Sequence, residues 1–134
     1  MIYLTRMIRF CAAHRLYDAT LSEEENRERF GECANLHGHD YALEVTVAGE
    51  PDERTGMLVH LSKLDAIVRE RVVDRLDHKY LNVDVPVFSD VVPTIEMLAK
   101  YVWEELDGRI PDVSLHRVRI HEDDLTADYY GETD

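Results

Sequence analysis

The sequence lacks the features of several protein classes. It has two cysteines and no CxxC pair, which excludes a disulfide-stapled scaffold and leaves each cysteine to be judged as a free thiol. No apolar run approaches the roughly 18 residues that a membrane span requires. The first residues do not have the layout of a signal peptide. We therefore expect a cytoplasmic protein.

Basic residues are also scarce. The chain has 15 Lys and Arg against 28 Asp and Glu, a formal net charge of −13. Nucleic acids and anionic membranes are bound by clustered basic surfaces, so we expect neither as a partner. The length of 134 residues is that of one domain. No linker, repeat or low-complexity tract divides it, so residues 1–134 are predicted to form a single domain.

Hydrophobic periodicity predicts an α+β fold. Alternating apolar residues indicate four strands, over residues 2–10, 40–49, 113–120 and 126–130. Helical spacing predicts two helices, one from Ser62 to about Asp77 and one from Pro93-Thr94 to the glycine stop at Gly108. The order is ββααββ, with both helices expected on one face of an antiparallel sheet.

A polar insert separates the first two predicted strands. Residues 18–32 suit a surface loop or a short helix, and Ser22 followed by Glu25 has the spacing of a capping box. The insert leads to one of the two cysteines, Cys33. The other, Cys11, lies in an apolar run and is interpreted as a small buried side chain rather than a reactive thiol.

The clearest chemical signal is the motif His37-Gly38-His39 at the start of a predicted strand. Residues two apart on a strand share a face, so both imidazoles can bind one metal ion. His14, expected just beyond the end of the first strand, adds a third imidazole, and Cys33 lies four residues before the motif. Three neutral imidazoles suit zinc and leave a fourth tetrahedral position open for water or substrate.

Two other interpretations of these residues stay open. A lone histidine is more often a satisfied core or surface residue than a ligand, although the pairing in this motif argues against that here. Alternatively, Cys33 is the fourth ligand of a closed structural site, although such sites usually have two or more thiolates.

Acidic residues beside a histidine or at element ends are weaker candidates. Asp77-His78-Lys79 lies at the predicted end of the first helix. Adjacent helical residues diverge, so Asp77 and His78 can cooperate only if the helix has ended there. Glu122 follows the apolar run of its strand, and Glu96 lies in the first turn of the second helix, where a carboxylate is also favoured for purely structural reasons.

Together these motifs resemble a known enzyme family. The matching segments cover nearly the whole chain, at residues 10–16, 22–26, 30–33, 37–41, 55–57, 76–79, 93–96 and 121–122. In order and spacing they are similar to 6-pyruvoyltetrahydropterin synthase and its bacterial relative, 6-carboxytetrahydropterin synthase. No single segment is decisive, but the combination is specific.

The resemblance implies a tunnelling fold (T-fold), in which subunits join their sheets into a barrel. It implies a homo-oligomer, a hexamer built as a dimer of trimers, with active sites at subunit interfaces. It also implies that His14, His37 and His39 bind zinc and that Cys33 is the catalytic base. Zinc on the side-chain hydroxyls of the family substrate, 7,8-dihydroneopterin triphosphate, would acidify the carbon-bound proton that must leave.

The remaining roles also follow from the resemblance. Asp77 and His78 are expected to form a proton-relay pair that reaches in from a neighbouring subunit. Glu122 is expected to anchor the pterin ring, whose 2-amino and ring N–H donors suit a carboxylate. Thr94 and Glu96 are expected to line the pocket of that ring.

The two branches of the family make different products. Three residues separate Cys33 from His37, as in the bacterial carboxy-forming branch, whereas residues 82–92 look more like the pyruvoyl branch. We expect a zinc-dependent lyase that forms 6-carboxy-5,6,7,8-tetrahydropterin for queuosine biosynthesis and releases triphosphate. The alternative is a 6-pyruvoyltetrahydropterin synthase of a tetrahydrobiopterin-type pathway. Outside this class, a non-catalytic zinc-stabilised module that binds a pterin or a protein, or a zinc hydrolase, stays possible.

Overall fold

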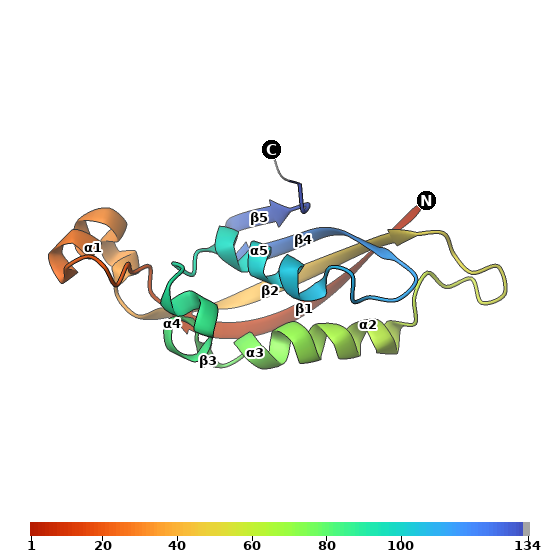
Figure 1. The fold of residues 1–134 in the computed structure, drawn as a ribbon, viewed down its shortest axis with the longest axis horizontal. Helices are drawn as coiled ribbons and strands as arrows, with labels where there is room; N and C mark the ends of the chain where they lie inside the picture. Colours follow the sequence, from red (N-terminus) through yellow and green to blue (C-terminus); the bar gives the residue numbers. More distant parts are fainter. Residues whose placement is uncertain (133–134) are drawn as a thin grey trace.

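A five-stranded sheet forms the framework of the computed structural model, which describes residues 1–132 (Figure 1). The strands are β1 (Ile2–His14), β2 (His37–Gly49), β3 (Lys79–Tyr80), β4 (Ser114–Glu122) and β5 (Leu125–Tyr129). Their order in the sheet is β3-β1-β2-β4-β5. β3 runs parallel to β1, and the other neighbouring pairs are antiparallel.

The helices lie in the connections between the strands. α1 (Glu23–Phe30) and the 3₁₀ turn η1 (Gly31–Ala34) join β1 to β2. After β2 comes one continuous helix made of α2 (Leu61–Val68), the π-helical turn η2 (Arg69–Val73) and α3 (Asp74–Leu76). The segments that follow β3 are α4 (Leu81–Asp84), the 3₁₀ turn η3 (Pro86–Ser89) and α5 (Ile95–Leu106). Every helix within residues 1–132 is too short or too polar to span a bilayer.

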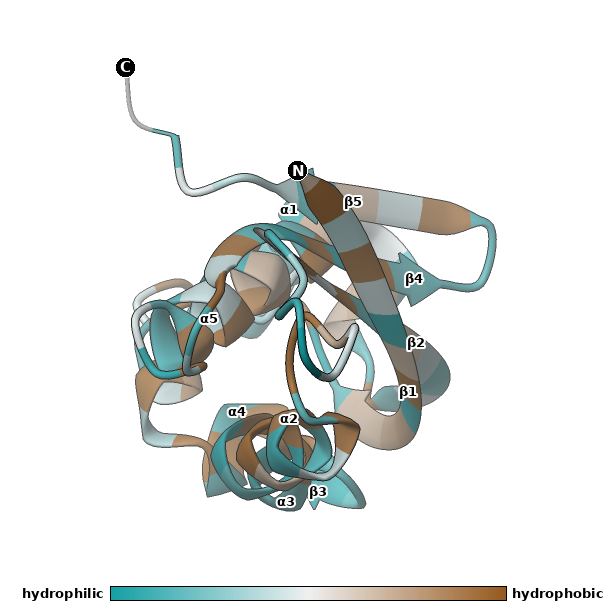
Figure 2. Ribbon diagram, turned by 90° about the vertical axis from the view of Figure 1, so that its right-hand side faces the viewer, coloured by the Kyte–Doolittle hydropathy of each residue, from teal (hydrophilic) through white to brown (hydrophobic). Residues whose placement is uncertain are grey.

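The hydrophobic core lies between one face of the sheet and the helices. Figure 2 shows α2, α3 and α5 on the same side of the strands. Side chains alternate along β1 and β2, so Ile8 and Phe10 are buried together with Leu43, Val45 and Val47. The helical residues packed in the same core include Leu64, Val68, Leu98 and Val102. The expected α+β class is confirmed, with both long helices on one face.

The expected ββααββ order and purely antiparallel sheet need correction. β3 adds a parallel edge strand through Ala12 and Ala13 of β1, and a two-residue strand has no periodicity that a sequence could show. The first strand continues to His14, because its pairing with β2 extends to that residue. The long helix begins at Leu61, so Ser62 is not the N-cap that its spacing predicted.

The polar insert is held by one buried amide. Ser22 and Glu25 form the predicted capping box at the start of α1. Asn26, the following residue, is completely buried. Its amide nitrogen donates to the backbone carbonyls of Asp18 at 2.9 Å and Ser22 at 3.0 Å, and its Oδ1 accepts from the Asp18 N–H at 2.7 Å. This side chain therefore ties α1 to the end of β1 and sets the path toward Cys33.

We predict that Asn26→Asp will loosen the insert without unfolding the sheet. The substitution keeps the shape but removes two donors and places a carboxylate against carbonyl oxygens. Hydrogen exchange of the α1 amides should become about 10- to 100-fold faster, since an unsatisfied buried polar group costs about 1–3 kcal/mol. Glu28→Gln, the reverse chemical change at an exposed site on the same helix, is the control and should leave exchange unchanged. Equal protection in both variants would contradict the role of Asn26.

Candidate metal centre and active site

Strand pairing brings three histidines together. In the register of β1 and β2, His14 lies opposite His37, and His39 lies opposite Ala12. His14, His37 and His39 alternate with outward-facing residues, so all three point to the helix-covered face of the sheet. Their ring centroids are 4.6, 4.9 and 5.1 Å apart. One nitrogen from each ring lies within 4.8 Å of the others.

Hydrogen bonds determine which nitrogen each ring presents. His14 Nδ1 donates to the Pro93 carbonyl at 2.8 Å, and His37 Nδ1 donates to the Asn35 carbonyl at 2.7 Å. His39 Nδ1 lies 3.0 Å from Asp123 Oδ2. Because these oxygen atoms accept hydrogen bonds, the protons lie on Nδ1 and the Nε2 lone pairs are free. This tautomer and its outer acceptors are what a metal-binding imidazole requires.

The free nitrogens fit a metal ion. The Nε2 atoms of His14 and His39 are buried and have no hydrogen-bond partner, although buried polar atoms in proteins normally have one. Burial lowers the pKa of His14, so its imidazole stays neutral, as a ligand must be. Three neutral imidazole nitrogens are a donor set suited to zinc. The three histidines named by the sequence therefore form a group that could hold one metal ion.

Two unpartnered oxygens lie beside this cluster. Glu122, opposite Tyr41 in the β2–β4 pairing, has Oε1 3.7 Å from His39 Nε2. Its Oε2 and the Tyr41 hydroxyl are buried without a hydrogen-bond partner. Burial, together with the negative charge of Glu122, raises the pKa of Tyr41, so its hydroxyl stays protonated. The site thus offers one acceptor and one donor to a ligand beside the proposed metal position.

Cys33 is exposed in η1 and is not part of the histidine cluster. Its backbone carbonyl accepts from the N–H of Leu16 at 2.8 Å, which holds η1 against the residues after β1. A tetrahedral zinc would need its sulfur about as close to the histidine nitrogens as they are to each other. The geometry of the described chain therefore does not support the closed structural site.

Asp77 and His78 are in contact just after the helix, as their cooperation requires. The helix ends at Leu76, and His78 adopts a left-handed backbone with φ of 60°. His78 Nδ1 is 3.0 Å from Asp77 Oδ1. The Cys11 backbone N–H, which donates to Asp77 Oδ1, lowers the pKa of that carboxyl, and the neighbouring His78 acts in the same direction. The pair therefore combines an ionised carboxylate with an exposed imidazole.

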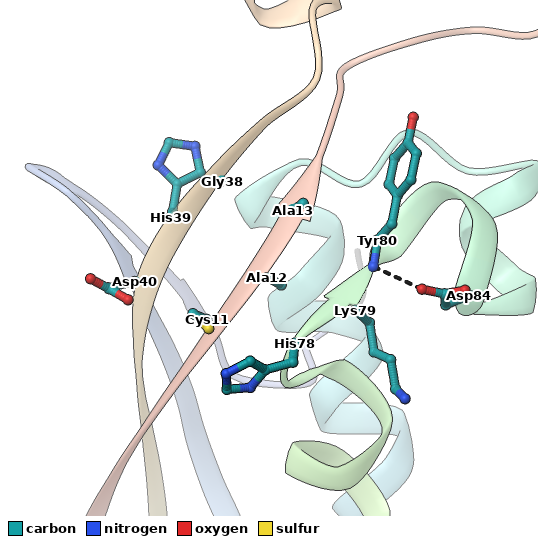
Figure 3. Close-up of a pocket in the computed structure, with 10 residues that line it drawn as sticks. All are labelled: Cys11, Ala12, Ala13, Gly38, His39, Asp40, His78, Lys79, Tyr80 and Asp84. Carbon is teal, nitrogen blue, oxygen red and sulfur yellow. Dashed lines mark hydrogen bonds between the residues drawn. The ribbon is translucent and has the colours of Figure 1, made fainter.

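The pair belongs to a separate group of side chains. Asp77 and His78 gather with Cys11, whereas Cys33 belongs to neither that group nor the histidine cluster. Cys11 is only partly buried, which corrects its interpretation as a core side chain. It lines a cavity of about 620 Å³ together with Asp40 and His78 (Figure 3).

Thr94 and Glu96 begin α5. Thr94 is the N-cap, and its hydroxyl accepts from the Met97 N–H at 3.2 Å. Glu96 is exposed in the first turn. The preceding residue, Pro93, orients His14, which connects this segment to the metal centre. A direct role of Thr94 and Glu96 in lining a pterin pocket stays a prediction.

Comparison with known proteins identifies the family. A family model described as 6-pyruvoyl tetrahydropterin synthase matches residues 3–132. The chain belongs to this family. It is 46% identical over 130 residues to the 6-pyruvoyl tetrahydrobiopterin synthase of Poecilia reticulata, covering 96% of this chain and 88% of that protein. It is also 46% identical to the human protein of that name, covering 90% of this chain and 85% of the human one.

A solved structure agrees with the family assignment. The 6-pyruvoyl tetrahydropterin synthase of Caenorhabditis elegans superposes with a TM-score of 0.90 at 38% identity, covering 98% of this chain and 96% of that one. The resemblance stated from the motifs is therefore confirmed, and the chain is a lyase of this family.

The expected product was wrong. The similar proteins are named 6-pyruvoyl tetrahydrobiopterin synthases, which favours the pyruvoyl alternative over 6-carboxytetrahydropterin formation. The misleading signal was the short spacing between Cys33 and His37. These residues flank a connection between η1 and β2, and connections change length more readily than the elements they join.

The sequence interpretation also missed four contributors to the site. Tyr41 could have been found, because it continues the two-residue period of His37 and His39 on the same strand. Asn35 and Pro93 contribute through backbone carbonyls, which residue type does not reveal. Asp123 lies in the β4–β5 turn with φ of 52°, and only the folded turn brings its carboxylate to His39.

We predict that Asp123→Asn will weaken zinc binding by about 10-fold, the lower end of the range for outer-shell partners, because the Asp123 side chain is largely exposed. Asparagine tolerates the left-handed backbone at this position, so the effect should come from the lost carboxylate. Chelator competition at fixed pH measures the affinity. Asp124→Asn, the same change at the next residue of the turn, should bind zinc as the unsubstituted chain does. Equal affinities for both variants would show that Asp123 does not support His39.

Proposed function

We propose that this chain converts 7,8-dihydroneopterin triphosphate to 6-pyruvoyltetrahydropterin and releases triphosphate, with zinc held by His14, His37 and His39. The observation that carries the proposal is the convergence of three Nε2-presenting imidazoles beside unpartnered Glu122 and Tyr41 oxygens. Names of the similar proteins support the pyruvoyl product.

The pterin ring is assigned to Glu122. Its Oε2 has no partner in the protein, so it is available to accept from the 2-amino and ring N–H groups of a pterin. The Tyr41 hydroxyl beside it offers a donor. When bound, zinc would supply Lewis-acid polarisation of the side-chain oxygens of the substrate. Thr94 and Glu96 are proposed to bound the ring pocket at the start of α5.

Cys33 is proposed as the base that removes the carbon-bound proton. Asp77 and His78 are proposed to return protons while the side chain rearranges and triphosphate leaves. Asp77 Oδ1 lies 3.0 Å from His78 Nδ1 and limits the orientations of that ring. Since Cys33 does not belong to the group that contains the pair within one chain, we assign the pair that serves a given Cys33 to a neighbouring subunit.

The sheet has edges suited to such an assembly. β3 covers β1 only at Ala12 and Ala13, so in the described chain the rest of that edge is unpaired, as is the outer edge of β5. Open edges readily pair with further strands. Apolar side chains exposed along the uncovered part of β1 are Ile2, Tyr3, Leu4 and Met7. These features support the proposed T-fold oligomer, a hexamer made of two trimers.

The direct test of the reaction is the identity of the product. Zinc-loaded protein incubated with 7,8-dihydroneopterin triphosphate should release triphosphate and form a pterin with the mass of the 6-pyruvoyl compound. Mass spectrometry of the reaction mixture, with metal-free protein as the control, makes the measurement. Unchanged substrate would contradict lyase activity. A hydrolysed phosphoester with an intact side chain would instead indicate a zinc hydrolase.

Subunit mixing tests the shared site. Cys33→Ala and His78→Asn should each bind zinc normally but lose turnover by about 10²- to 10⁴-fold, the usual contribution of an acid–base group. Exchanged into mixed oligomers, the two variants should recover about a quarter of full activity, because a random mixture pairs an intact Cys33 with a neighbour's intact His78 at that frequency.

The matched control for mixing is His78→Asn with Asp77→Asn, which damage the same half of the site and should recover nothing. Absence of recovery in the test pair, or equal recovery in the control, would contradict the interface assignment. Loss of zinc or of folding in Cys33→Ala would favour the non-catalytic zinc-stabilised module.

A further inference from the structure

A second group of metal-ligating side chains lies away from the three histidines. Cys11 Sγ, a carboxylate oxygen of Asp77 and an imidazole nitrogen of His78 all lie within 4.8 Å of one another. Cys11 and His14 are three residues apart on β1, so their side chains point to opposite faces of the sheet. Figure 3 shows the Cys11 sulfur and the His78 ring beside each other. The two groups are therefore separate.

Backbone hydrogen bonds hold this second group together. The Cys11 N–H donates to Asp77 Oδ1 at 3.0 Å, and the His78 N–H donates to the Cys11 carbonyl at 2.7 Å. The left-handed backbone of His78 turns its ring toward Asp77. The three side chains are thus positioned by the attachment of the helix end to β1 rather than by chance contact of mobile surface residues.

We propose that Cys11, Asp77 and His78 form a second metal site for a borderline divalent cation such as zinc. Thiolate, imidazole and carboxylate are all zinc ligands. With bonds of about 2.0–2.2 Å, nitrogen and oxygen ligands of a tetrahedral ion lie about 3.3–3.6 Å apart. His78 Nδ1 and Asp77 Oδ1 are already 3.0 Å apart, so little movement is needed on that side.

The surroundings of the group suit a cation that has a coordination position left for a further ligand. Arg9 and Asp40 line the adjoining cavity, of about 370 Å³, and their opposite charges offset each other. Lys79 points away from the Cys11 sulfur in Figure 3. Asp40 lies opposite Cys11 in the strand pairing. Water or this second carboxylate can therefore complete the coordination.

Metal binding changes the protonation of the group in a defined way. A metal bound through His78 Nδ1 leaves the ring proton on Nε2, and coordination of Cys11 as a thiolate releases the thiol proton to solvent, one for each ion bound. A metal on Nδ1 takes the place of the direct contact with Asp77 Oδ1. On the proposed function, this immobilises the proton-relay pair, so excess zinc should inhibit turnover.

Cobalt binding tests the site without reference to turnover. Metal-free protein is titrated with Co²⁺ in the presence of a reductant that is not a thiol. Two ions per chain should bind, and the second should add the near-ultraviolet charge-transfer absorption of a cobalt–thiolate bond. The three-histidine site contains no sulfur and should give none.

Cysteine variants assign the signal. Cys11→Ser should bind one ion and lose the charge-transfer band, whereas the matched variant Cys33→Ser should keep both. His78→Asn should lower the affinity for the second ion at least 10-fold. Asparagine tolerates the left-handed backbone at this position. A single ion in the unsubstituted chain, or a band that persists in Cys11→Ser, overturns the proposal. Loss of the band in Cys33→Ser also overturns it and assigns the thiolate to the histidine site.

Activity then tests the consequence separately. At one equivalent of zinc, Cys11→Ser should have the same turnover rate as the unsubstituted chain. Excess zinc should inhibit only the unsubstituted chain. Equal inhibition of both would overturn the inhibitory role. If neither protein releases triphosphate, the proposed lyase function fails, while the cobalt result still decides whether the second site exists.

Discussion

The pairing of β1 with β2 is the constraint on which the rest of the site depends. Its register places His14 opposite His37 and Ala12 opposite His39, so two strands far apart in sequence present three imidazoles on one face. A shift of one residue would turn one set of side chains to the opposite face. The core side chains on the same face, such as Phe10 and Leu43, oppose that shift. Core packing and ligand placement are therefore enforced by the same alternation.

The hydrogen bonds behind the histidines connect the candidate metal centre to three other parts of the chain. Pro93 precedes α5, Asn35 follows η1, and Asp123 lies in the β4–β5 turn. Each element contributes one acceptor, and each acceptor selects the tautomer that leaves Nε2 free. A site built in this way is preorganised, because the rings are oriented before any ion arrives. It also explains why loop and turn residues matter here as much as the ligands do.

Much of this arrangement follows from residue patterns, and the exceptions have physical causes. The histidine pair on β2 and the two long helices were predictable because each carries a period, of two residues on a strand or of 3.6 in a helix. β3 was not, since Lys79 and Tyr80 pair with β1 only through the tertiary position of the helix end. The contacts of Asp123 and Cys11 were not predictable either, because the residues that they contact are distant in sequence. The product was misjudged because the spacing of Cys33 from His37 reports loop length rather than chemistry.

The proposed catalytic groups lie in three separate places in one chain. On the proposed mechanism, a single chain therefore does not contain a complete active site. The histidines and Glu122 share the helix-covered face of the sheet, whereas Cys11 points to the other face and gathers Asp77 and His78 around it. Cys33 is exposed on the insert held by Asn26. On that mechanism, the proposed base and the proposed relay meet when a second subunit supplies one of them. An assembly along the open edge of β1 would then bring together groups that the single fold keeps apart, and the stability of that interface would limit catalysis as directly as the chemistry does.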